Sequence, residues 1–369
     1  MPGHSLQVVD RNYVLFEGRR LLFFAGTDYH RLSTHPAVAE AAAKAARQFG
    51  ISPGGSRTTT ADHPLYAKLE EKLAGFFGRE AALLLPSGYL AAMALLQGIA
   101  ADFDVLFLDE QAHSSLKDAA AISGMRQHVF RHLDSENLQD LIKKNLRGRE
   151  KPLLLTDGVF PARGEIAPLA EYSGMMKSAG GAILADDAHA MAVTGPTGKG
   201  SPETAGVNRE LLFQTGTLSK GFGVFGGVIT GQRALIERIR RNSAVFSGSS
   251  GLPLPAAAAA LQAVSILQEN PRLISGLQQT AFAFTEKLVK LGLFSQAARV
   301  PIVSITWPDQ QTNTDFYRAL LEAGIYPSYN NYPGSPQGGH FRFVLSSQHS
   351  KTHLDLLHGV IEMFCKKGR

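Results

Sequence analysis

The feature that most limits the fold is a regular alternation of short apolar runs with helix-like stretches through the middle of the chain. Apolar runs bounded by polar or glycine residues occupy positions 83–85, 104–108, 153–156, 182–185, 211–215 and 228–231. Runs of this length are typical of strands buried on both faces of a parallel sheet. We therefore predict an α/β fold with a doubly wound large domain, whose mostly parallel sheet is covered by helices.

The sequence around this region predicts two further parts. Helical spacing at residues 36–49 and 64–77 opens the large domain, and the first helix stops at Gly50. After a long helix over residues 256–270, extended and helical patterns mix, which predicts a smaller α+β domain. We accordingly divide the 369 residues into an N-terminal segment (1–35), a large domain (36–255) and a C-terminal domain (256–369).

Membrane and secreted proteins are excluded by the apolar pattern. The most apolar window, residues 83–101, contains Pro86, Gly88 and Gly98, so no run of about 20 apolar residues spans a bilayer. The N-terminal residues include Asp10 and Arg11 and lack the apolar core of a secretory signal. We expect a cytoplasmic protein that has no membrane partner.

Cysteine usage and charge exclude two further classes. Cys365, the one cysteine, can form no internal disulfide and has no cysteine or histidine partner at zinc-ligand spacing. The net charge of +5 comes from basic residues dispersed among acidic ones. The densest basic stretches, residues 143–151 and 233–241, fit solvated faces. We expect no metal and no nucleic acid, whereas anionic small substrates remain compatible.

The most informative stretch, Thr217-Leu218-Ser219-Lys220-Gly221, follows a predicted strand. A surface lysine needs no such small neighbours, so we predict that a flat group approaches this backbone. Lys220 would hold the aldehyde of pyridoxal phosphate (PLP) as a Schiff base, with Thr217 hydrogen-bonding the phosphate. Taken alone, the stretch would more often be a glycine-rich turn with an exposed lysine.

Polar side chains at two other strand ends support the cofactor. Asp186, Asp187 and His189 follow the strand predicted at 182–185, at the edge where open α/β sheets bind ligands. Asp186 could keep the pyridine nitrogen protonated, whereas Asp187 could instead cap the next helix. His113 follows another strand end and could stack on the cofactor ring, or be an ordinary polar residue.

Seven ordered motifs together resemble the α-oxoamine synthases, fold-type-I PLP enzymes, over nearly the whole chain. They are Gly54-Gly55-Ser56-Arg57, Pro64-Leu65-Tyr66, Ser87-Gly88-Tyr89, His113-Ser114-Ser115-Leu116, Thr156-Asp157-Gly158-Val159-Phe160, Asp186-Asp187-Ala188-His189 and Thr217-Leu218-Ser219-Lys220. The resemblance implies a homodimer with its site at the subunit interface. It also implies a decarboxylating condensation of an amino acid with an acyl-CoA.

Residue roles follow from the same resemblance. Lys220 matches the Schiff-base lysine and Asp186 the partner of the pyridine nitrogen. His113 matches the ring-stacking histidine, and His189 the histidine beside the phenolic oxygen of the cofactor and the reacting carbons.

The resemblance also implies contacts to the phosphate and the substrate. Phosphate contacts match Ser87, Gly88, Tyr89 and Thr217. Ser250 resembles the phosphate ligand lent by the other subunit, although it could be only a loop hydroxyl. Arg342 aligns with the arginine that holds the substrate carboxylate, a role that suits a guanidinium, although it could be only a strand-edge charge.

The chain also departs from the family pattern. Where the family has His-Gly-Thr-Gly-Val, it has His189-Ala190-Met191-Ala192-Val193, which predicts less room near the site. Pro161 replaces a serine whose hydroxyl lies near the cofactor, and His340 replaces an arginine. We also expect the chain to lack an N-terminal helical segment of longer members.

The resemblance therefore implies a PLP-dependent acyltransferase, similar to 8-amino-7-oxononanoate synthase, that condenses a small amino acid with an acyl thioester and releases carbon dioxide. The altered acyl side favours, as an alternative, an aminotransferase or another amino-acid-transforming enzyme that does not use CoA. A non-catalytic binding protein is disfavoured by the intact Lys220 and Asp186.

Overall fold

The computed structural model describes residues 5–330 and 339–367, which form two compact units. The large unit comprises His35–Phe160 and Ile166–Pro271, and the small unit comprises Met1–Thr34, Pro161–Glu165 and Arg272–Arg369. Helix α10 (Leu254–Glu269) therefore stays with the large unit, and the first residues of the chain join the C-terminal ones. The units thus differ from the domain boundaries that we predict from the sequence.

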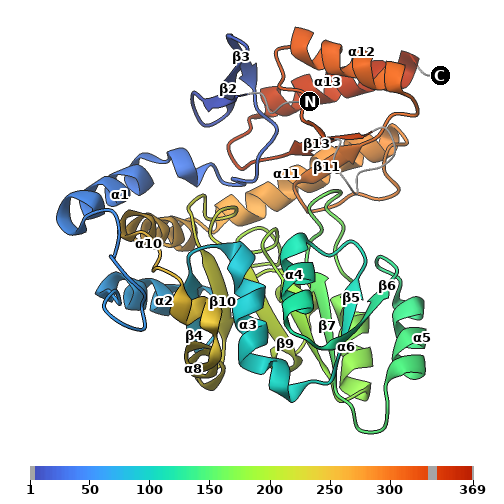
Figure 1. Ribbon diagram of the computed structural model, residues 1–369. Coiled ribbons are helices and arrows are strands. Elements are labelled where there is room, and N and C mark those ends of the chain that lie inside the picture. Colours follow the sequence, from blue (N-terminus) through green and yellow to red (C-terminus); the bar gives the residue numbers. More distant parts are fainter. Residues whose placement is uncertain (1–4, 331–338, 368–369) are drawn as a thin grey trace. The chain divides into compact units, whose positions relative to one another are not determined.

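A seven-stranded sheet forms the centre of the large unit (Figure 1). Its strands lie in the order β4-β10-β9-β8-β7-β5-β6. Their bounds are β4 Ala81–Leu85, β5 Val105–Asp109, β6 Arg126–Phe130, β7 Pro152–Asp157, β8 Ala182–Asp186, β9 Leu212–Thr217 and β10 Gly227–Gly231. All six predicted runs are strands of this sheet, as the doubly wound prediction requires.

The sequence does not predict two features of the sheet. Strand β10 pairs antiparallel with both β4 and β9, because residues 218–226 are too few for a crossover helix. Strand β6 lies at the edge and alternates half-buried with exposed residues before the buried Phe130, so it carries no continuous apolar run.

Helices cover both faces of this sheet. Leu106, Leu108 and Leu153 point toward α3 (Ala91–Ile99), α4 (Ser114–Ile122) and α8 (Arg233–Asn242) in one apolar core. Alternate residues of the same strands, Phe107 and Leu154, point into a second core with α5 (Ser135–Asn145) and α6 (Leu169–Ser178). Because successive strand residues face opposite sides, burial on both faces produces the continuous apolar runs seen in the sequence.

Two helices at the start of the large unit have the ends that the sequence predicts. Helices α1 (Pro36–Phe49) and α2 (Pro64–Phe77) each begin with proline after a capping histidine, His35 or His63. Proline suits this first position because its missing N–H would have no helical partner. Each helix ends at a glycine, and the second glycine, Gly78, is left-handed. Helix α1 packs on α10 within the same unit.

Remaining short helices of the large unit are η2 (Gly88–Leu90), η3 (Ala100–Asp102), α7 (Ser201–Ala205), η4 (Arg209–Leu211) and α9 (Ala244–Gly248).

The small unit contains a three-stranded antiparallel sheet in the order β11-β13-β12. Its elements are β11 Ile302–Ile305, β12 Tyr329–Asn330, β13 His340–Val344, α11 Arg272–Lys290, α12 Gln310–Glu322 and α13 Lys351–Lys367. An N-terminal sheet, β1 (Gln7–Val8), β2 (Tyr13–Phe16) and β3 (Arg19–Leu22), precedes η1 (Leu32–Thr34). A bridge between Leu22 and Ile325 joins this sheet to the rest of the unit.

Candidate active site

The carboxyl ends of the parallel strands bring the predicted polar residues to one edge of the sheet. Strands β7, β8 and β9 run side by side and end at Asp157, Asp186 and Thr217. Asp157 and Asp186 are direct register partners. Open α/β sheets bind ligands at this edge, so the fold itself places a candidate site here.

Lys220 lies in the loop that follows β9, and its Nζ is 2.8 Å from Nε2 of His189. His189 is almost completely buried, at 5% exposure, and follows the end of β8. The loop therefore places an amine and an imidazole within hydrogen-bond distance of each other at the sheet edge. This pair brings together two of the three residues that we predict to be catalytic.

Asp186, the third, is buried and linked to His113 through one serine. Its carboxylate accepts hydrogen bonds from the amide of Ala188 at 2.9 Å and from Oγ of Ser115 at 3.4 Å. The same Oγ lies 2.8 Å from Nδ1 of His113. These contacts fix the carboxylate at the end of β8, beside the start of α4.

Asp157 is a member of this cluster to which the sequence analysis gives no role. Its carboxylate accepts the backbone N–H of His113 at 2.8 Å. Burial, followed by the charge of Asp186, raises the pKa of Asp157 well above its ordinary value. The Thr156–Phe160 motif could have indicated Asp157. Two neighbouring buried carboxylates repel each other, so such a pair at a strand end usually marks a functional site.

His113 is held at the start of α4. Its Nδ1 accepts the N–H of Ser115 at the start of α4, so the ring acts as the helix cap. Burial lowers the pKa of His113, and the charge of Asp186 offsets this in part. A fixed aromatic ring is suited to stacking on a flat cofactor.

Asp187 is turned to a different set of partners, which separates its role from that of Asp186. Its carboxylate accepts hydrogen bonds from the hydroxyl and the N–H of Ser201 and from Nε2 of Gln214. Burial raises the pKa of Asp187 to about 6. Because Ser201 begins α7, this side chain ties a helix start to the sheet, in line with the capping alternative.

The Ser87–Tyr89 turn lies against the end of β9. Ser87 caps η2 by accepting the N–H of Tyr89 at 3.3 Å. A Cβ on Gly88 would lie only 2.6 Å from Cβ of Thr217, so only glycine fits this close approach. The turn and Thr217, two predicted phosphate contacts, are thereby brought together.

The hydroxyls of the remaining predicted contacts already have protein partners. Thr217 donates to the carbonyl of Gly226 at 2.8 Å, which closes the loop that carries Lys220. The Tyr89 hydroxyl donates to Asp118, and its ring centroid lies 6.1 Å from that of His113. Phosphate contact at Thr217 or Tyr89 would therefore use the backbone, or a hydroxyl that changes partner.

Ser250 lies in a loop between α9 and α10, with its side chain exposed. It pairs with Ser56 in an isolated antiparallel bridge.

Arg342 belongs to β13 of the small unit. Its Nε donates to the carbonyl of Pro161 at 2.5 Å. Within the described residues, the buried Nη2 of Arg342 has no hydrogen-bond partner. Burial raises the pKa of the neighbouring Tyr29 to about 12, although the charge of Arg342 opposes this rise. An oriented guanidinium with a buried donor to spare suits a carboxylate ligand.

Comparison with known proteins decides the family. Residues 21–361 match the family described as aminotransferase class I and II. The chain belongs to this family. The 8-amino-7-oxononanoate synthase of Thermosipho melanesiensis is 33% identical over 358 residues, which cover 97% of this chain and 90% of that protein. The 8-amino-7-oxononanoate synthase 1 of Bacillus velezensis is 32% identical over 352 residues, which cover 95% and 90%.

A solved structure agrees with this assignment. The serine palmitoyltransferase of Sphingomonas wittichii has a TM-score of 0.91 and 26% sequence identity, and the match covers 98% of this chain and 92% of that one. The fold-type-I prediction is confirmed, and so is the prediction of a PLP-dependent acyltransferase of the α-oxoamine synthase type. Its cofactor is PLP.

The segment that departs most from the α-oxoamine synthase pattern is accommodated inside the large unit. Residues 190–193 are all fully buried. The thioether of Met191 lies over Gly216, where a Cβ would be 2.4 Å from its sulfur. Ala192 adopts a left-handed backbone with φ of 60°, as the glycine of the family pattern would. Our expectation that these side chains reduce the open space of the site stays a prediction.

The described residues contain neither a membrane-spanning helix nor a metal-binding cluster. Among residues 5–330 and 339–367, no helix is long and apolar enough to cross a membrane. The same residues contain no cluster of metal-ligating side chains.

Proposed function

We propose that this α-oxoamine synthase condenses a small amino acid with an acyl thioester such as an acyl-CoA, releasing carbon dioxide and the thiol, as a homodimer. The observation that carries the proposal is the pairing of the Lys220 amine with His189 at the sheet edge that also holds Asp186. Relatives named 8-amino-7-oxononanoate synthase support a reaction of that type.

The residues present suit PLP. A buried carboxylate at Asp186, an imidazole with a lowered pKa at His113 and a turn that only glycine permits at Gly88 are features that suit a flat, phosphorylated pyridine. When bound, PLP supplies an electron sink for the negative charge that develops on the substrate Cα. Lys220 would carry the cofactor covalently, and Ser87, Gly88, Tyr89 and Thr217 would hold its phosphate.

Asp186 and His113 would contact different parts of the cofactor ring. Asp186 would hold a proton on the pyridine nitrogen, because an ionised carboxylate stabilises a positive partner. The ring of His113 would lie against the face of the cofactor. The hydrogen bonds from Ser115 and Ala188 keep the Asp186 carboxylate oriented for this task.

Lys220 and His189 would handle the proton transfers. Once its amine is released by the substrate, Lys220 is placed to remove the Cα proton as a general base. His189, within hydrogen-bond distance of that amine, would hold it in place and donate to the carbonyl of the incoming thioester. Arg342 would bind the substrate carboxylate.

The proposal of a homodimer depends on Ser250. Its exposed hydroxyl fits a ligand outside its own unit, and we propose that it binds the cofactor phosphate in the site of a second copy.

A thiol-release assay tests the reaction. Purified protein is incubated with pairs of small amino acids and acyl-CoA chains of increasing length, and free thiol is measured together with carbon dioxide. We expect equal amounts of both for at least one pair, and neither from the Lys220→Ala variant.

The runner-up is an aminotransferase, favoured by the replacement of a serine of the family pattern with Pro161, which has no side-chain donor. Formation of a keto acid without thiol from any pair would establish it in place of the condensation.

A further inference from the structure

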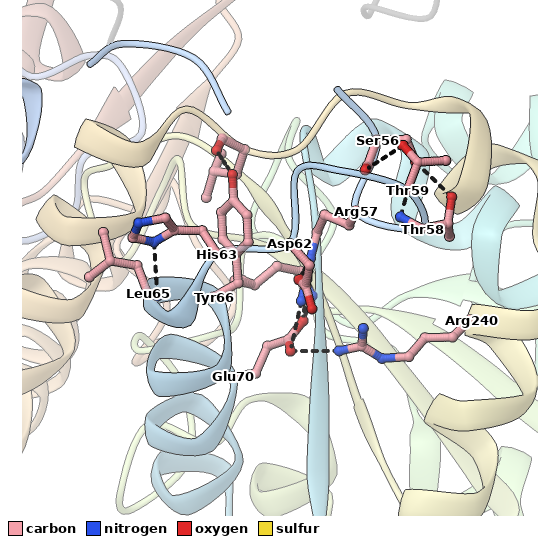
Figure 2. Close-up of polar contacts among 12 residues, drawn as sticks. Ser56, Arg57, Thr58, Thr59, Asp62, His63, Leu65, Tyr66, Glu70 and Arg240 are labelled. Atoms are coloured by element: carbon pink, nitrogen blue, oxygen red, sulfur yellow. Dashed lines mark hydrogen bonds and ion pairs between the residues drawn. The ribbon is translucent and has the colours of Figure 1, made fainter. Parts of the chain in front are cut away.

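A buried ion cluster ties together four segments of the large unit (Figure 2). Glu70, on α2, accepts hydrogen bonds from Arg57 at 2.6 Å and from Arg240 of α8 at 2.6 Å. It also accepts the backbone N–H of Leu84 in β4 at 2.9 Å. Figure 2 shows the side chains of Arg57 and Arg240 converging on the Glu70 carboxylate.

The cluster holds Arg57 in one orientation. Only 5% of its side chain is exposed, and its Nε donates to Asp62 at 2.8 Å. Burial alone would lower the pKa of Arg57, but its hydrogen bonds and attraction to Glu70 and Asp62 raise it overall. A buried guanidinium with these partners keeps its charge and its position.

Arg57 in turn fixes the ring of Tyr66. Its guanidinium carbon lies 4.6 Å from the centroid of that ring, a cation–π contact. The Tyr66 hydroxyl donates to the backbone carbonyl of Leu252. A Cβ on Gly251 would lie 2.7 Å from this hydroxyl, so the tyrosine and the neighbouring backbone are in close contact.

Three further contacts, all with residues 55 and 56, hold the backbone of residues 247–251. We name residues 249–252 the Ser250 segment. Its Ser250 pairs with Ser56, and the N–H of Gly251 donates to the carbonyl of Gly55 at 3.1 Å. The Ser56 hydroxyl donates to the carbonyl of Ser247 at 2.6 Å. The Ser250 segment is therefore fastened by Tyr66 and by residues 55–56, while the Ser250 side chain stays exposed.

We propose that Tyr66 is a positioning residue for the cofactor phosphate: its hydroxyl, oriented by Arg57 and Glu70, holds the Ser250 segment so that Ser250 binds the phosphate in the site of a second copy. This inference rests on the proposed function and on the homodimer. Tyr66 itself does not touch the cofactor, and its effect passes through the backbone of Leu252.

The test compares two cofactor forms that differ only in the phosphate. Full-length protein is depleted of cofactor and titrated with PLP or with pyridoxal, which lacks the phosphate. The variants are Tyr66→Phe, Ser250→Ala and the double variant. Tyr172→Phe is the matched control, because Tyr172 is fully buried in the same unit and its hydroxyl has no hydrogen-bond partner among the described residues.

We expect Tyr66→Phe to bind PLP about tenfold more weakly and pyridoxal within about twofold of the unaltered protein. In the Ser250→Ala background, Tyr66→Phe should change PLP affinity by less than about twofold, since the contact through which it acts is gone. Tyr172→Phe should leave the ratio of PLP to pyridoxal affinity unchanged.

Equal weakening of PLP and pyridoxal, or an undiminished effect in the Ser250→Ala background, would overturn the inference while leaving the proposed function intact. Failure of the unaltered protein to bind PLP would instead count against the proposed function. If Tyr66→Phe does not fold, as judged by circular dichroism, Glu70→Gln gives the same test, because it weakens the contact that orients Arg57 and therefore the ring of Tyr66. A smaller loss specific to PLP supports the inference, and no change in the ratio refutes it.

Discussion

Substitution of Gly88 by alanine should displace the turn that we assign to the cofactor phosphate. The new Cβ would lie 2.6 Å from Cβ and 2.8 Å from Oγ1 of Thr217. Reaching ordinary contact distance requires a shift of roughly 1 Å. Thr217 cannot move to make room, because it is buried at the end of β9 and hydrogen-bonded to Gly226. Overpacking of this kind costs about 1–3 kcal/mol.

The loss should appear in two measurements. Urea unfolding of Gly88→Ala should give a free energy of unfolding lower by about 1–3 kcal/mol. PLP should bind at least about tenfold more weakly, because hydrogen bonds to a charged phosphate are among the strong ones. Gly174→Ala is the control, since a Cβ there meets nothing within 4 Å in the middle of α6, and it should stabilise by about 0.5–1 kcal/mol. A Gly88→Ala variant with unaltered stability and PLP affinity would refute the assignment of this turn.

Three further outcomes follow from the structure. Asp186→Asn should retain PLP but slow exchange of the substrate Cα proton with deuterium at least about tenfold, measured by NMR; an unchanged rate would assign the role to another carboxylate. Ala192→Gly should raise the free energy of unfolding by about 0.5 kcal/mol, because the strain of a left-handed alanine backbone outweighs the greater freedom of glycine in the unfolded chain. A free energy of unfolding lowered by more than about 1 kcal/mol would contradict this. Burial, followed by the charge of Arg31, lowers the pKa of His349 from 6.5 to about 3 in the folded protein. As pH drops, the unfolded chain therefore takes up a proton at His349 before the folded protein does. The free energy of unfolding should consequently fall between pH 6.5 and pH 3. Urea unfolding followed by fluorescence of Trp307, the one tryptophan and also in the small unit, should show this slope, and His349→Gln should flatten it.

Much of the large unit could be predicted because its signals are local. Helices α1 and α2 begin at a proline and end before a glycine, and the structure gives both the bounds read from the sequence. The lysine and carboxylate motifs each follow an apolar run, so the ends of β8 and β9 locate them without knowledge of the whole fold.

What could not be predicted depends on contacts between distant segments. The direction of β10 follows from a short connection, and β6 carries no apolar run because it lies at an edge. The raised pKa of Asp157 depends on its burial in the folded sheet and then on the strand register that sets it beside Asp186. The burial of Met191 depends on its position over Gly216, which a comparison of motifs does not reveal.

The most direct test of the account is to locate the covalently held cofactor. The purified protein is reduced with borohydride, digested and mapped by mass spectrometry. The pairing of Lys220 with His189 at the end of β9 predicts a pyridoxyl group on the peptide that contains Lys220. Recovery of the label on a different lysine, or of no labelled peptide from protein saturated with PLP, would contradict the assignment of this site.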